Sequence, residues 1–99
     1  MAEYILQILK AQLMVVFSWG FHRPTRLPDN KGLAFRVNGF KYQGRVAVEY
    51  DEGKDLFDVV VGDERITDVY IENLVDVIDS AVERTTDYED RVKQYYNLQ

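Results

Sequence analysis

The apolar residues at the start of the chain recur at helical spacing. They lie one, three and four positions apart, at Ile5, Leu6, Leu9, Leu13, Val16 and Phe17. This spacing predicts a helix over residues 3–18. The polar stripe of this helix is narrow, because Ile8, Val15 and Trp19 spread apolar character around most of its circumference. Such a helix needs cover on more than one side, so we expect a sheet together with either a second helix or a partner subunit against it.

The next segment, residues 20–32, is predicted to be a loop. It contains both prolines, two glycines and the pair Asp29-Asn30, all of which disfavour a continuing helix. It is the longest irregular segment that the pattern predicts. Because long loops in compact domains often carry function, it is the first place to look for a site.

From residue 33 onward, apolar and polar residues alternate, which predicts strands with one buried face. The alternating sets are Leu33, Phe35 and Val37, then Val46, Val48 and Tyr50, and then Phe57, Val59 and Val61. A short fourth strand is expected from Ile66 to Tyr70. Asn38-Gly39 is a common hairpin turn, but a bulge at Gly39 with a turn near Gln43-Gly44 fits equally well, and both alternatives stay open.

Helical spacing returns in the last third of the chain. The apolar face of the predicted helix consists of Ile71, Leu74, Val75, Ile78 and Val82. Thr86 and Glu89 have the spacing of a capping box, which predicts a second helix carrying Tyr88, Val92 and Tyr95 inward. The predicted fold is therefore α+β: an N-terminal helix, a three- or four-stranded antiparallel sheet, and one or two C-terminal helices packed on one sheet face.

Four runs within residues 32–79 carry a resemblance to a known group of proteins. They are GLAFRVNG, YQGRVAVEY, DLFDVV and VYIENLVDVID. Together they resemble small uncharacterised α+β proteins of Bacteroides-type gut bacteria and their mobile elements. The resemblance implies a bacterial α+β fold and no catalytic residue, because that group has no assigned activity.

Composition narrows the class of protein. A chain of 99 residues that is 46% hydrophobic has core material for one domain, which we assign to residues 1–99. The chain contains no cysteine, so thiolate nucleophiles and thiolate metal sites are excluded. Glu3 lies where a secretion signal would carry cations, and no apolar run has the length of a membrane span. We therefore expect a soluble, cytoplasmic protein with no membrane partner.

Charge is unevenly distributed along the chain. Residues 20–48 carry a net charge of +5 and residues 49–90 a net charge of −12, within an overall charge of −5. A candidate interaction patch lies at the start of the basic part and includes the tryptophan just before it. Its members are Trp19, Phe21, His22, Arg23 and Arg26, supported by Lys31 and Arg36. Arginines that hold phosphates beside rings that stack on bases would suit single-stranded nucleic acid. The alternative is that Trp19 and Phe21 close the core while the arginines are solvated or pair with acids.

The helix predicted from Ile71 to Val82 has a candidate acidic face. Its members are Glu72, Asp76, Asp79 and Glu83. Like charges three and four residues apart destabilise an isolated helix, and a basic partner surface, including the 20–45 segment of a second copy, would offset that cost. A solvated helix face is the alternative.

Candidate chemistry is sparse. His22 is the only histidine, and although Ser18 lies four residues before it, no nucleophile-elbow motif surrounds that serine. The acids of residues 51–58 lack the spacing of a calcium loop, and no phosphate-binding glycine loop is present. We predict no catalytic, cofactor-binding or metal-binding residues. The predicted function is a non-catalytic protein-interaction module, including self-association as a homodimer, with an accessory nucleic-acid-binding protein as the alternative.

Overall fold

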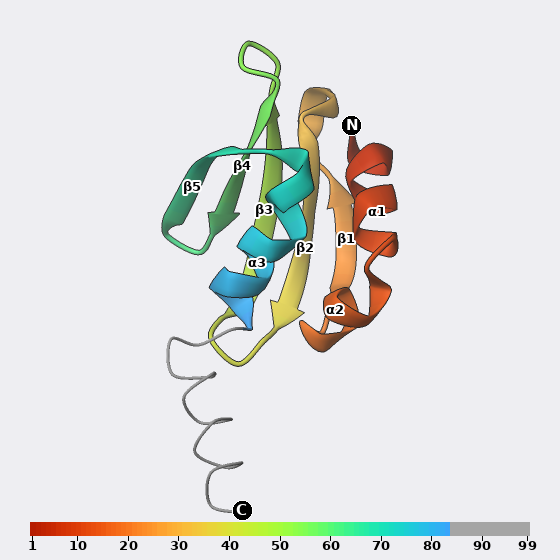
Figure 1. Cartoon of the computed structure of the whole chain (residues 1–99), viewed down its shortest axis with the longest axis vertical. Helices are drawn as coiled ribbons and strands as arrows, with labels where there is room; N and C mark the ends of the chain where they lie inside the picture. Colours follow the sequence, from red (N-terminus) through yellow and green to blue (C-terminus); the bar gives the residue numbers. More distant parts are fainter. Residues whose placement is uncertain (84–99) are drawn as a thin grey trace, which may run out of the picture.

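The computed structural model describes residues 1–83, and the alternating segment forms the centre of the structure (Figure 1). Within these residues, two α-helices precede the sheet and one follows it. In chain order the elements are α1 (Ala2–Lys10), α2 (Leu13–Ser18), β1 (His22–Arg26), the short 3-10 turn η1 (Pro28–Asn30), β2 (Gly32–Asn38), β3 (Gln43–Asp51), β4 (Leu56–Val61), β5 (Glu64–Val69), η2 (Ile71–Asn73) and α3 (Leu74–Val82). This arrangement confirms the predicted α+β class. The second C-terminal helix predicted from Thr86 onward lies outside the described residues.

The strands form one antiparallel sheet in the order β1-β2-β3-β4-β5. The prediction of three or four strands is wrong, because β1 lies within the segment predicted to be a loop. Pro24 is tolerated there since β1 is an edge strand that pairs only with β2, and an edge strand can lack one N–H donor. The pairing shifts between His22 and Thr25, and Arg23 between them has a φ of 53°, so the strand is irregular where the proline enters it.

The predicted helix over residues 3–18 is interrupted. α1 ends at Lys10 and α2 begins at Leu13, and Gln12 between them leaves the helical region with φ −126° and ψ 53°. In a straight helix Leu9, Leu13 and Val16 would share one face. The break instead leaves Leu9 and Val16 buried while Leu13 is exposed.

The helices pack their apolar residues against one face of the sheet, called here the inner face. Ile5 and Leu9 of α1 and Leu74 and Ile78 of α3 belong to the same core cluster as the alternating residues of β2, β3 and β4. The sheet contributes Leu33, Phe35, Val37, Val46, Val48, Phe57, Val59, Val61 and Val69. The apolar face predicted for the helix from Ile71 to Val82 is confirmed at the buried positions of α3. Ile71 itself lies in η2 and is half-buried.

The turn between β2 and β3 begins at Gly39, which decides between the two alternatives for this region. Asn38 pairs with Gln43, and residues 39–42 link β2 to β3. The chain therefore forms a hairpin, but with a longer connection than the two-residue turn that Asn-Gly favours. A Cβ atom at Gly39 would lie 2.3 Å from the carbonyl oxygen of Val82, so only glycine fits beside the end of α3.

The same turn binds the C-terminal end of α3. The carbonyl oxygen of Val82 accepts hydrogen bonds from the backbone N–H groups of Lys41 (2.9 Å) and Tyr42 (3.1 Å). The N–H of Phe40 donates to Oε2 of Glu83 at 3.1 Å. A helix ends with carbonyl groups that lack partners within the helix, and here the turn supplies the donors.

The opposite face of the sheet, called the outer face, carries the residues that alternate with the core. Ala34 and Ala47 lie side by side on it, and both are buried although neither belongs to the core cluster. Two residues along each strand, the same face carries the longer side chains Arg36 and Glu49. No helix among the described elements is long and apolar enough to span a bilayer.

Candidate functional site

Trp19 of the predicted interaction patch lies in the core. It follows α2, its side chain is fully buried, and its ring stacks on that of Phe35 with centroids 6.5 Å apart and an interplanar angle of 10°. Its Nε1–H donates a hydrogen bond to Oδ1 of Asp79 on α3 at 2.8 Å. A buried indole needs such a partner. The ring is therefore not presented for stacking on a nucleic-acid base, and it agrees with the alternative that Trp19 closes the core.

Phe21 and His22 lie on different sides of the boundary between core and solvent. Phe21 is half-buried and contacts Phe35, with ring centroids 4.7 Å apart. His22 is exposed at the start of β1, and its Nδ1–H donates to the carbonyl oxygen of Gly20 at 2.7 Å. The hydrogen bond holds the imidazole against the backbone. The predicted patch is thus divided, and its aromatic and basic members do not form one surface.

The two arginines of the patch differ in their contacts. Arg26 forms an ion pair with Glu3 of α1, and Arg23 is exposed with no ion pair to any residue of 1–83. The pKa of Glu3 is lowered, first because its carboxylate accepts a hydrogen bond from its own backbone N–H at the start of α1, and second because Arg26 lies close. Arg26 therefore helps to attach α1 to the edge of the sheet.

The four predicted acidic residues do not form one free surface. Glu72 lies in η2 and Asp76 in the first turn of α3, and both are exposed. Asp79 binds Trp19, and Glu83 binds the N–H of Phe40. Asp79 and Glu83 thus connect α3 and its C-terminal end to the rest of the fold.

An exposed apolar surface on α2 is the clearest candidate interaction site among the described residues, and it lies within the helix whose wide apolar arc predicted a need for cover. Leu13, Met14 and Phe17 are 44%, 84% and 63% exposed, whereas Val16 of the same short helix is buried. We call these three exposed residues the α2 surface. The signal in the sequence was the wide apolar arc of the predicted helix, but which part of that arc stays exposed depends on the break at Gln12.

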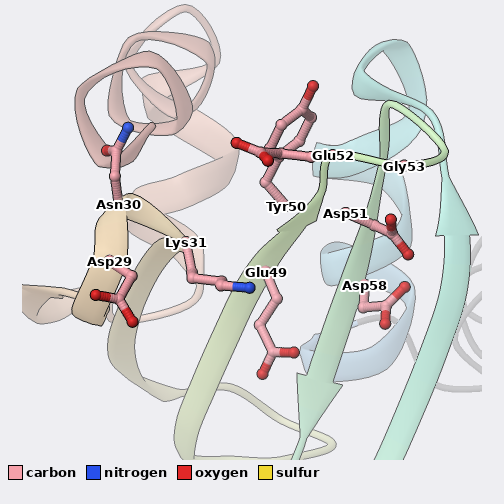
Figure 2. Close-up of a pocket in the computed structure, with 9 residues that line it drawn as sticks. All are labelled: Asp29, Asn30, Lys31, Glu49, Tyr50, Asp51, Glu52, Gly53 and Asp58. Carbon is pink, nitrogen blue, oxygen red and sulfur yellow. The ribbon is translucent and has the colours of Figure 1, made fainter.

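A polar hollow of about 470 Å³ lies between η1 and the β3–β4 turn (Figure 2). It is lined by Asp29, Asn30, Lys31, Glu49, Tyr50, Asp51, Glu52, Gly53 and Asp58. The carboxylates come from three separate parts of the chain, and Figure 2 shows Lys31 extending from the start of β2 toward β3. The sequence reasoning grouped only the acids of residues 51–58.

The acids around this hollow are engaged by different partners. Arg65 of β5 contacts both Glu49 (2.9 Å) and Asp58 (3.0 Å), and these two carboxylates raise the pKa of its guanidinium. Oδ1 of Asp51 accepts the backbone N–H of Lys54 within the turn. No three carboxylate or histidine side chains within residues 1–83 are arranged to hold a metal ion.

Comparisons with family models, curated proteins and solved structures find no match to the chain. The resemblance drawn from residues 32–79 therefore stays a prediction. Any functional conclusion rests on the geometry of the chain itself.

Proposed function

We propose that the protein is a non-catalytic interaction module that self-associates through the α2 surface. The observation that carries the proposal is the exposure of Leu13, Met14 and Phe17 on a helix whose buried side is fixed in the core. Clustered apolar side chains that stay exposed on a folded domain mark interaction sites. A non-catalytic role is supported by His22, because its one hydrogen bond within residues 1–83 is to a backbone carbonyl.

A second copy of the chain suits this surface on grounds of charge. Residues 11–21 contain no charged side chain, so two copies of α2 meet about a twofold axis without like-charge repulsion. A twofold contact also covers both copies of the surface at once. Because three side chains make a smaller interface than stable complexes use, we expect a dissociation constant of about 1 µM or weaker. The cytoplasm is the location we expect for this association.

Sedimentation velocity across low to high micromolar protein tests the proposal. The wild-type protein should shift from monomer toward dimer as concentration rises, and the double variant Met14→Gln/Phe17→Gln should stay monomeric. Tyr70→Gln is the matched control, because Tyr70 is also a large exposed side chain (58%) but lies outside α2. The proposal is wrong if the wild-type protein is monomeric throughout, or if the control loses the dimer equally.

A further inference from the structure

A second hollow lies on the outer face of the sheet, where β1, β2 and β3 pair. Its volume is about 420 Å³. It is lined by Arg23, Thr25, Arg26, Leu27, Pro28, Ala34, Phe35, Arg36 and Arg45. Four of these nine residues are arginines from three different strands. No acidic residue among residues 1–83 lines the hollow.

The arginines of the hollow have few partners. Arg26 is paired with Glu3, but Arg23, Arg36 and Arg45 form no ion pair with any residue of 1–83. We call these three the arginine cluster. By contrast, Arg65 on the same sheet contacts two carboxylates. The basic charge of the cluster is therefore available to a ligand.

The register of the strands concentrates this charge. Arg36 of β2 lies directly opposite Arg45 of β3, one of its two neighbouring strands. On the other neighbouring strand, β1, His22 lies opposite Arg36. Like charges directly opposite each other destabilise a sheet. A bound anion would remove that repulsion, because a guanidinium binds phosphate oxygens through two parallel hydrogen bonds.

The floor of the hollow favours recognition of phosphates over bases. Ala34 contributes a small side chain to the lining, and Thr25 lies opposite Ala34 on the edge strand. Phe35 also lines the hollow, but its ring packs against Trp19 and Phe21 on the inner face. No aromatic ring is offered for base stacking by the lining residues.

The rest of the outer face limits the size of the ligand. On this face the row next to the pair of Arg36 and Arg45 is uncharged across β2, β3 and β4, at Ala34, Ala47 and Val60. The row after it pairs Glu49 with Asp58, and the hollow of Figure 2 carries further acids. A double helix covering the whole face would be repelled there, since it carries phosphates on both strands. A single backbone can cross β1, β2 and β3 alone, over about 10 Å at the usual strand spacing.

We infer that the arginine cluster binds the phosphodiester backbone of a short single-stranded nucleic acid, contacting about three phosphates without reading the bases. This function goes beyond self-association and does not depend on it. It also replaces the aromatic-basic patch expected from the sequence, because Arg45 joins the site and Trp19 leaves it.

Fluorescence anisotropy with a fluorescein-labelled, mixed-sequence single-stranded DNA of about 12 nucleotides tests the inference. With three phosphates contacted, affinity should fall roughly twentyfold between about 50 and 200 mM salt. Arg36→Gln/Arg45→Gln should weaken binding at least tenfold. Lys10→Gln/Lys54→Gln is the charge-matched control, since both lysines are exposed and neither lines the hollow, and it should retain affinity within about threefold.

Three results would overturn the inference. The first is the absence of binding at low salt, and the second is equal weakening by the lysine control, which would indicate a nonspecific effect of net charge. The third comes from inorganic tripolyphosphate as competitor: if it binds as tightly as the oligonucleotide, the site suits a small phosphorylated molecule and not a backbone. Circular dichroism of the arginine variant should match the wild type, because both substitutions are at exposed positions.

Discussion

The two faces of the sheet use the same strands for different purposes. Phe35 on the inner face is 1% exposed and packs against Trp19 and Phe21, whereas its neighbour Arg36 points to the outer face and lies opposite another arginine. The inner face gains stability from apolar burial. The outer face gains little from its charges, and at Arg36 and Arg45 it loses some. Substitutions on the inner face should therefore unfold the protein, and those on the outer face should alter binding while the fold remains.

The largest expected change in the free energy of unfolding is at Trp19. Trp19→Ala removes a fully buried ring and its hydrogen bond to Asp79, and it should lower the free energy of unfolding by about 3–5 kcal/mol. Urea denaturation followed by circular dichroism measures the change. If the alanine variant does not fold, Trp19→Phe keeps an aromatic ring without the N–H donor and should still cost about 1–3 kcal/mol.

Phe17→Ala is the matched control for Trp19. It removes a ring two residues away on the same segment, but one that is 63% exposed, so the free energy of unfolding should change by no more than about 0.5 kcal/mol. Equal losses from Phe17→Ala and Trp19→Ala would contradict the assignment of Trp19 to the core and of Phe17 to the surface.

Two substitutions on the outer face, Arg45→Glu and Arg65→Glu, should change the free energy of unfolding by smaller amounts and in opposite directions. Arg45→Glu places a carboxylate opposite Arg36 and should raise the free energy of unfolding by about 0.2–1 kcal/mol while abolishing binding of the oligonucleotide. Arg65→Glu removes contacts with Glu49 and Asp58 and adds a third acid, so it should lower stability. Thermal unfolding of the two variants checks this. A loss of stability in Arg45→Glu would contradict the repulsion that we assign to the pair of Arg36 and Arg45.

The smallest expected effect on stability is its dependence on pH through Tyr50, which lies near the end of β3. Its hydroxyl donates to Oδ1 of Asp55 at 2.6 Å, and this hydrogen bond to a carboxylate raises the pKa of the phenol. The stability that the bond contributes is therefore fully present below the ordinary tyrosine pKa of about 10 and is lost as pH rises through the raised value. In Asp55→Asn the pKa of Tyr50 should fall toward the ordinary value, as measured from the NMR shift of its ring Cζ. Asp63→Asn is the control and should leave that pKa unchanged.

The sequence predicted the inner face well and the outer face poorly. Alternation in β2, β3 and β4 and the helical period of α3 follow directly from which residues are buried. β1 was missed because all five of its residues are exposed, so no alternation marks it, and Pro24 suggests a loop.

The candidate sites could not be predicted from local patterns, because they depend on contacts between residues that are distant in the sequence. Trp19 and Asp79 are sixty positions apart, so no local pattern shows that the indole is buried against α3. Arg36 and Arg45 face each other only because the chain turns at residues 39–42, and the sequence left that turn open between two alternatives. The exposure of the α2 surface likewise depends on the break at Gln12, which no proline or glycine signals.

The turn at residues 39–42 couples local unfolding of α3 to that of the β2–β3 hairpin. Val82 receives two backbone hydrogen bonds from that turn, so the last turn of α3 cannot unwind without releasing the hairpin. Trp19 and Asp79 tie the same helix to the segment before β1, and the backbone N–H of Asn38 binds the carbonyl oxygen of Trp19. Helix, hairpin and N-terminal segment therefore form a single cooperative unit, in which local opening at one contact requires the others to open with it.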